Sequence, residues 1–79
     1  MDYRRQKMVK TILNIEGMYW GGCGRRVNEA IKKSLQVEDV QSFHKENRTE
    51  ILSQAPLDEA ALKAAIDSTG YKLMGITVE

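Results

Sequence analysis

Three side chains in this sequence could bind a soft metal ion. Cys23 is the only cysteine, His44 is the only histidine, and Met18 offers a thioether. Thiolates select Cu(I) and similar soft ions over hard cations, and a Cys–His pair would form a mixed site that suits several ions. Cys23 is therefore the main candidate ligand. For Met18 the alternative is packing in the core, and for His44 it is a place on the polar surface.

The segment around Cys23 has features that favour a reactive sulfur. It follows a glycine-rich stretch and opens a helical pattern, with Arg25 and Arg26 directly after it. Backbone N–H groups at a helix N-terminus and nearby cations both favour the thiolate form. The sequence therefore predicts soft-metal or redox competence at Cys23, and the alternative is a cysteine left over from a lost site.

The pattern of hydrophobic residues predicts six elements that position these groups. Alternation predicts a first strand, and spacings of three and four residues predict two helices. Asn47 suits the positive φ of a hairpin turn, Asp58 an N-cap and Gly70 the end of the second helix. The expected strands are 8–16, 37–45, 48–54 and 71–78, with helices from about Cys23 to Leu35 and from about Asp58 to Thr69.

This order of elements predicts an α+β ferredoxin-like βαββαβ fold. A four-stranded antiparallel sheet with both helices on one face buries each apolar helical stripe once. We expect residues 1–8 to form a flexible arm and residues 9–79 a single domain. Strand alternation also predicts an apolar patch on the face without helices. We expect this patch to mediate self-association or docking. Its members would be Ile12, Phe43, Leu52, Met74 and Ile76.

The run from Ile15 to Cys23 resembles the start of a heavy-metal-associated domain, the family of copper chaperones and of N-terminal modules of metal-pumping P-type ATPases. That family carries the motif G-M-x-C-x-x-C, and Gly17, Met18 and Cys23 match it. The stretch from Leu62 to Tyr71 resembles the family's second helix and Gly-Tyr loop. The resemblance covers about residues 9–78 and implies the same fold.

The sequence departs from the family in the metal-binding motif, because Trp20 occupies the position of the first cysteine. The resemblance implies Cu(I) or another soft ion as cargo, held weakly by Cys23, or no metal at all. It implies Trp20 and Tyr71 as groups that cover the site or contact a partner. Implied partners are a metal-transporting ATPase, another heavy-metal-associated domain, or a second copy that shares an ion through its own Cys23.

The composition and residue types argue against several classes of protein. Lys and Arg total 12 against 11 Asp and Glu, a balance that argues against nucleic-acid binding. RNA recognition would also need aromatic residues on the two central strands. No apolar run is long enough to span a membrane, and the single cysteine fits a reducing, cytoplasmic setting. Nothing forms a nucleophile–base set, so we expect a binding module and not an enzyme. The alternative function is a metal-independent interaction or dimerisation module.

Overall fold

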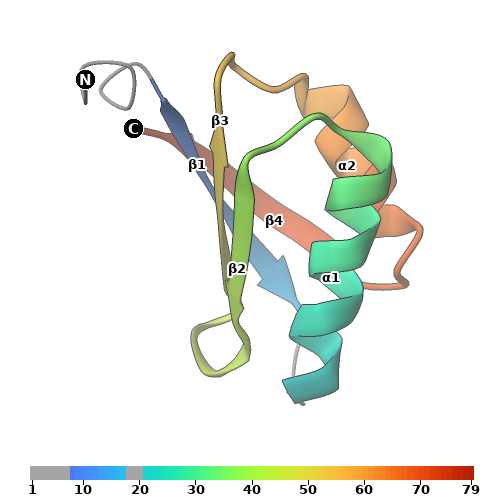
Figure 1. The fold of residues 1–79 in the computed structure, drawn as a ribbon. Helices are drawn as coiled ribbons and strands as arrows, with labels where there is room; N and C mark the ends of the chain where they lie inside the picture. Colours follow the sequence, from blue (N-terminus) through green and yellow to red (C-terminus); the bar gives the residue numbers. More distant parts are fainter. Residues whose placement is uncertain (1–7, 18–20) are drawn as a thin grey trace.

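A computed structural model describes residues 8–17 and 21–79 of the chain. Its four strands and two α-helices follow the predicted order, with a short 3₁₀ helix, η2, inside the hairpin between the second and third strands. Figure 1 shows both α-helices packed against one face of the sheet. The elements are β1 (Val9–Glu16), α1 (Gly21–Ser34), β2 (Asp39–Phe43), η2 (His44–Glu46), β3 (Arg48–Ser53), α2 (Glu59–Asp67) and β4 (Lys72–Val78).

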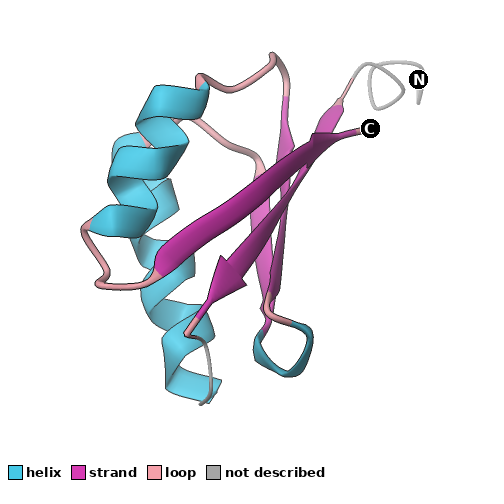
Figure 2. Ribbon diagram, turned by 180° about the vertical axis from the view of Figure 1, so that it is seen from behind, coloured by secondary structure: helices cyan, strands magenta, loops and turns pink. Residues whose placement is uncertain are grey.

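The sheet has the strand order β2-β3-β1-β4, and every neighbouring pair is antiparallel. The two crossovers through α1 and α2 place the helices on the same side, as Figure 2 shows from behind. This is the predicted α+β ferredoxin-like fold. Strands β1 and β3 are central, so the segment that leads from β1 into α1 starts at the middle of the sheet.

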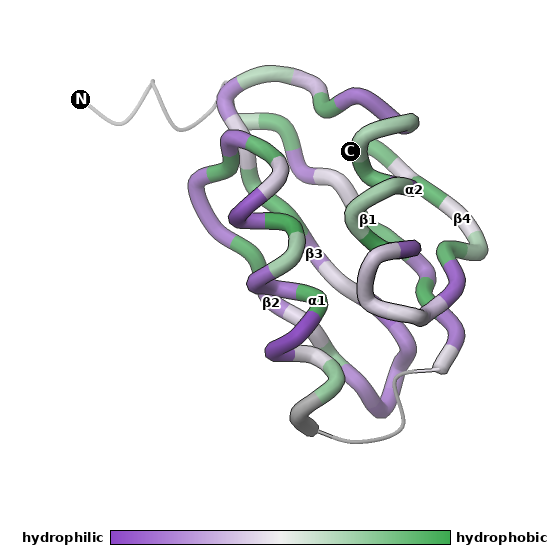
Figure 3. The backbone as a smooth tube through the Cα atoms, turned by 90° about the vertical axis from the view of Figure 1, so that its right-hand side faces the viewer, coloured by the Kyte–Doolittle hydropathy of each residue, from purple (hydrophilic) through white to green (hydrophobic). Residues whose placement is uncertain are grey.

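The core lies between the helices and the sheet. It is formed by one side of β1 and one apolar stripe of each α-helix, together with apolar residues of the other strands, and the hydropathy colouring in Figure 3 shows apolar residues recurring along these elements. Because the apolar residues repeat every second position in a strand and every third or fourth in a helix, each element presents one apolar side to this layer. The buried apolar residues are Leu13, Ile15, Val27, Ile31, Val40, Ile51, Leu62, Ala65 and Ile66.

The hairpin between β2 and β3 is longer than predicted, and both strands are shorter. Strand β2 ends at Phe43 because the next three residues wind into η2. Asn47 then takes the predicted left-handed conformation, with φ of 52°, and its N–H donates to the carbonyl of His44 at 3.2 Å. Asp58 occupies the N-cap of α2 as predicted, although its side chain makes no capping hydrogen bond.

A β-bulge in β4 changes which residues face the helices. The pairing between β1 and β4 shifts between Asn14 and Ile15, which leaves Met74 as the extra residue. Ile76 therefore lies opposite the buried Leu13 and packs against the core. The prediction that Ile76 belongs to the open face was wrong, because strict alternation along a strand does not anticipate a bulge.

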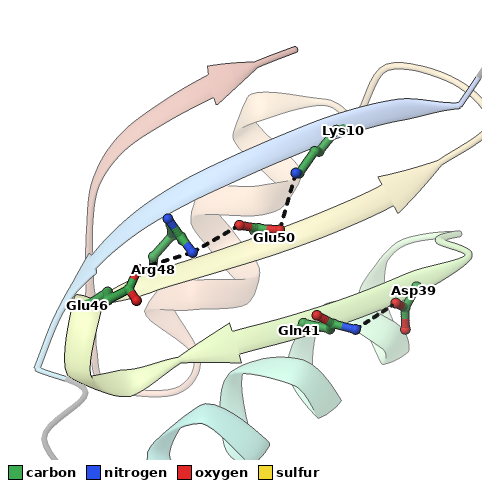
Figure 4. Close-up of polar contacts among 6 residues, drawn as sticks. All are labelled: Lys10, Asp39, Gln41, Glu46, Arg48 and Glu50. Carbon is green, nitrogen blue, oxygen red and sulfur yellow. Dashed lines mark hydrogen bonds and ion pairs between the residues drawn. The ribbon is translucent and has the colours of Figure 1, made fainter.

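The open face of the sheet carries charges at its centre, as Figure 4 shows. Glu50 is within 3.4 Å of Lys10 and 3.2 Å of Arg48, and Arg48 also pairs with Glu46 at 3.1 Å. The Arg48 guanidinium lies 4.9 Å from the centre of the Phe43 ring. Of the predicted apolar patch, Leu52 and Met74 are exposed, while Ile12 and Phe43 are only partly so. Instead of one continuous apolar patch, this face has separate apolar groups around an ion-pair network.

Candidate functional site

Cys23 lies in the first turn of α1, at the end of the molecule where β1 leads towards that helix. Its side chain is half-buried and packs against the core cluster. The next residue, Gly24, brings the helix close to β2, since a Cβ atom on it would lie 3.0 Å from Cβ of Ser42. Asn28 lies one turn after Gly24 in α1, and its Oδ1 accepts a hydrogen bond from the Ser42 hydroxyl at 2.7 Å. These contacts fix the N-terminal end of α1, and with it Cys23, against the sheet.

Tyr71 meets Cys23 from the other side of the site. It lies between α2 and β4, and its hydroxyl donates a hydrogen bond to the Cys23 side chain. Two groups support its backbone: Oγ1 of Thr69 accepts from the Tyr71 N–H at 3.3 Å, and Gly70 has a φ of 88°. The turn that ends the second helical segment therefore aims Tyr71 at the first turn of α1.

Gly17 makes room for the Tyr71 ring. It has a φ of 108°, and a Cβ atom at this position would lie 3.2 Å from Cδ1 of Tyr71. Both the positive φ and the close approach of the ring favour glycine. The end of β1, the start of α1 and the turn before β4 thus converge on one cluster, whose described members are Gly17, Cys23 and Tyr71.

The electrostatics of this cluster are dominated by the sulfur. The hydrogen bond to Cys23 raises the pKa of Tyr71 above its ordinary value of 10.0, and desolvation and the negative charge of the Cys23 thiolate raise it further. The positive charge of Arg26 acts in the opposite direction on the same pKa. Tyr71 is therefore held as a neutral phenol, which is the form that donates a hydrogen bond to a thiolate.

The remaining predicted site residues are Met18, Trp20 and His44. Met18 and Trp20 lie outside the described residues. His44 is half-buried in η2, just beyond the end of β2, so it does not belong to the strand that the sequence predicted over 37–45. Across residues 8–17 and 21–79, no group of three or more His, Cys, Asp or Glu side chains is arranged to hold a metal ion. Cys23 is the one thiol in this part of the chain.

Sequence reasoning missed how Gly17 and Thr69 support the site. The sequence places Gly17 in the family motif and Thr69 in the second helix, but it does not predict their contacts with Tyr71. A glycine directly after a predicted strand is an available signal, since it often marks a positive φ. The contact between Thr69 and Tyr71 is also local, because the Thr69 hydroxyl accepts from the N–H two residues later, and a threonine directly before Gly70 is the signal that could have found it.

Known structures resemble this chain over most of its length, whereas no family model and no curated protein sequence matches it. The N-terminal domain of a potential copper-translocating P-type ATPase from Bacillus subtilis, in its Cu(I)-loaded state, is 27% identical with a TM-score of 0.69, over 89% of this chain and 91% of that one. The CopZ metallochaperone is 24% identical with a TM-score of 0.72, over 82% and 98%. A copper binding domain from HMA7, a P-type ATPase, is 18% identical with a TM-score of 0.71, over 90% and 93%.

These neighbours are a metallochaperone and metal-handling domains, which supports the expectation of a binding module instead of an enzyme. Among the described residues, no helix is long and apolar enough to cross a bilayer. Fold, coverage and structural likeness to these domains agree with the resemblance found in the sequence.

Proposed function

We propose that this chain is a soft-metal binding or transfer module with a weakened, one-cysteine site, and that its cargo is Cu(I) or a similar ion. The observation that carries the proposal is the position of Cys23, half-exposed in the first turn of α1 in a fold shared with copper-handling domains. The sulfur is fixed by the surrounding fold yet open enough to reach an ion.

The neighbouring groups suit a thiolate that exchanges an ion. Tyr71 donates a hydrogen bond to Cys23, and such a bond stabilises the negative charge of a free thiolate. Metal binding withdraws that charge, so the same hydrogen bond favours the metal-free form slightly. One sulfur supplies half of the two-thiolate set that Cu(I) prefers. Both effects predict weak binding and fast release, which suit transfer better than storage.

The charges beside Cys23 indicate the partner. Arg25 and Arg26 are exposed directly after the first turn of α1, and that turn contains no acidic residue. A partner with acidic groups around its own metal site would be drawn to this end of the molecule. A metal-transporting ATPase or another heavy-metal-associated domain is the proposed partner, and it would supply the second sulfur during transfer.

The second candidate function is a metal-independent interaction module. It is suggested by the sequence, which has one cysteine and carries Trp20 at the position of the family's other cysteine. Under this alternative, the domain binds a protein partner without metal, and tryptophan is enriched among the residues that contribute most to protein interfaces. The two functions differ in one respect: the first needs the Cys23 sulfur and the second does not.

A competition titration separates them. Reduced protein is titrated with Cu(I) in the presence of a chromogenic chelator of known affinity, and Cys23→Ser is the matched control. The proposal predicts that the wild type takes Cu(I) from a weak chelator and that Cys23→Ser does not. If the two proteins behave alike, metal binding through Cys23 is excluded and the interaction function takes its place.

A further inference from the structure

The outer edge of β4 offers a strand-pairing site that is separate from the cysteine end. Strand β4 lies at one edge of the sheet, and Figure 2 shows α2 beside it. Among the described residues, no strand pairs with its outer side. Of the three large hydrophobic side chains that are exposed on this part of the chain, two belong to β4: Met74 at 57% and Val78 at 58%.

The two edges of the sheet differ in how well they are protected. Strand β2 has five residues and runs directly into η2, which limits pairing along it. In β4 the bulge at Met74 interrupts the first half of the strand, but pairing with β1 is regular from Gly75 to Val78. Backbone hydrogen bonds between Lys10 and Glu79 extend this regular stretch by one residue.

The same hydrogen bonds show which amides of β4 are free for a partner. Lys10 and Glu79 exchange two backbone bonds, with N–O distances of 3.5 and 2.8 Å, so they form a hydrogen-bonded pair. In an antiparallel ladder such pairs alternate with non-hydrogen-bonded ones. The N–H and C=O groups of Gly75 and Thr77 therefore point towards β1, and those of Ile76 and Val78 point outward.

We propose that this segment, Gly75 to Glu79, pairs antiparallel with the same segment of a second copy, with Thr77 on the two-fold axis. In this register Ile76 lies opposite Val78 of the second copy, and both have outward N–H and C=O groups, so two symmetric pairs of backbone hydrogen bonds form. Both side chains are also on the helix-covered side, since Ile76 and Val78 lie opposite Leu13 and Thr11. Shifting the register by one residue would set opposite faces against each other.

A groove beside the edge accommodates the second strand. It has a volume of about 460 Å³ and is lined by one side of α2 and by β4 from Leu73 to Ile76. Val78 of the second copy, which is mostly exposed in the free chain, would cover Ile76 at this groove. In this register Glu79 of the second copy lies opposite Gly75, three residues from Lys72, and both charged side chains are on the open face, so unlike charges lie at each end of the interface.

This dimer does not depend on metal. Tyr71 and Cys23 lie at the start of β4, on the far side of the bulge from the proposed axis. Five paired residues make a small interface, and small interfaces of this kind give weak association. The two copies would form one continuous sheet of eight strands, with the two cysteine ends pointing away from each other.

The test is sedimentation equilibrium on metal-free Cys23→Ser protein over a concentration series. We expect a monomer–dimer equilibrium that Val78→Pro weakens about tenfold or more, because proline removes the outward N–H and its amide serves no bond to β1. The matched control, Val78→Ala, loses the same side chain but keeps the N–H, so its dimer should be weakened less. A monomer at every concentration, or a dimer that Val78→Pro and Val78→Ala affect equally, would overturn the proposal.

A cross-linking experiment keeps the proposal testable if Val78→Pro fails to fold. Thr77 would lie opposite Thr77 of the second copy in a non-hydrogen-bonded pair. The two Cα atoms would be about 4.5 Å apart, a distance compatible with a disulfide. In the Cys23→Ser background, Thr77→Cys should form a disulfide-linked dimer quickly on mild oxidation. Lys72→Cys lies off the axis on the same strand face and should cross-link far more slowly. Equal rates would rule out this register, and strand addition by a different partner would then be the remaining use of the edge.

Discussion

The helix-covered face of the sheet and the cysteine end differ in how many independent contacts fix them. On the helix-covered face, both α-helices and all four strands contribute buried apolar side chains or pack against them, so each residue is held by several neighbours. At the cysteine end, one sulfur meets one phenol, with a glycine below the ring. The core is therefore fixed by many contacts from every element, whereas the described part of the cysteine end depends on a few contacts around one thiol.

A deletion in the core is expected to give the largest effect on stability. Leu13 is fully buried at the centre of β1, so Leu13→Ala should lower the free energy of unfolding by about 2–5 kcal/mol. Leu52→Ala, on the open face, removes the same group from a side chain that is 36% exposed and should cost much less. Chemical denaturation of the two variants measures the difference. Equal losses would mean that the two faces are not distinguished as the structure describes.

Restoring the second sulfur should change affinity more than stability. By the family motif, Trp20→Cys recreates the two-thiolate pair, and we expect Cu(I) affinity to rise at least about a hundredfold, or ~2.7 kcal/mol. Competition against a chelator measures this change. Trp20→Ser, which removes the indole without adding a sulfur, is the control and should not gain affinity. A Trp20→Cys variant that binds no better than wild type would argue against the family's ligand geometry at this end.

The smallest predicted effect is on the ionisation of Tyr71. Its pKa is raised chiefly by the hydrogen bond to Cys23, so Cys23→Ser should lower the pKa of Tyr71 towards its ordinary value. The sign for stability follows: a raised pKa in the fold contributes stability below about pH 10, and that contribution is lost as the pH rises through the folded value. An ultraviolet titration of phenolate absorbance, with Tyr71→Phe to identify the transition, measures the shift. An unchanged transition in Cys23→Ser would show that the two side chains do not interact.

Sequence alone predicted the order of elements and the sides of β1 and both helices, because the apolar period is two or close to 3.6 in those segments. The prediction was wrong where a local irregularity of the backbone interrupts the regular spacing of apolar residues. The bulge moved Ile76 into the core, and η2 took His44 out of the strand. Sequence alone also did not predict the ionic centre of the open face, because Lys10 is far along the chain from Arg48 and Glu50 and only the pairing of β1 with β3 places it beside them.

For the site, sequence identified Cys23 and Tyr71 as residues of one end of the molecule, and the structure brings them into contact. Their functional roles stay predictions. What sequence could not supply was the support beneath them, since the fit of the Tyr71 ring over Gly17 depends on three chain segments meeting in space.

The central claim is that Cys23 holds the metal, and the most direct measurement is a Cu(I) titration of reduced wild type and Cys23→Ser with mass followed throughout. We expect the wild type to bind Cu(I) through sulfur and Cys23→Ser to lose this binding. Saturation at one ion per two chains, with doubled mass, would show that two copies share the ion through their Cys23 sulfurs. One ion per chain without a change in mass would show that each chain binds alone. Equal Cu(I) binding by wild type and Cys23→Ser would contradict the account.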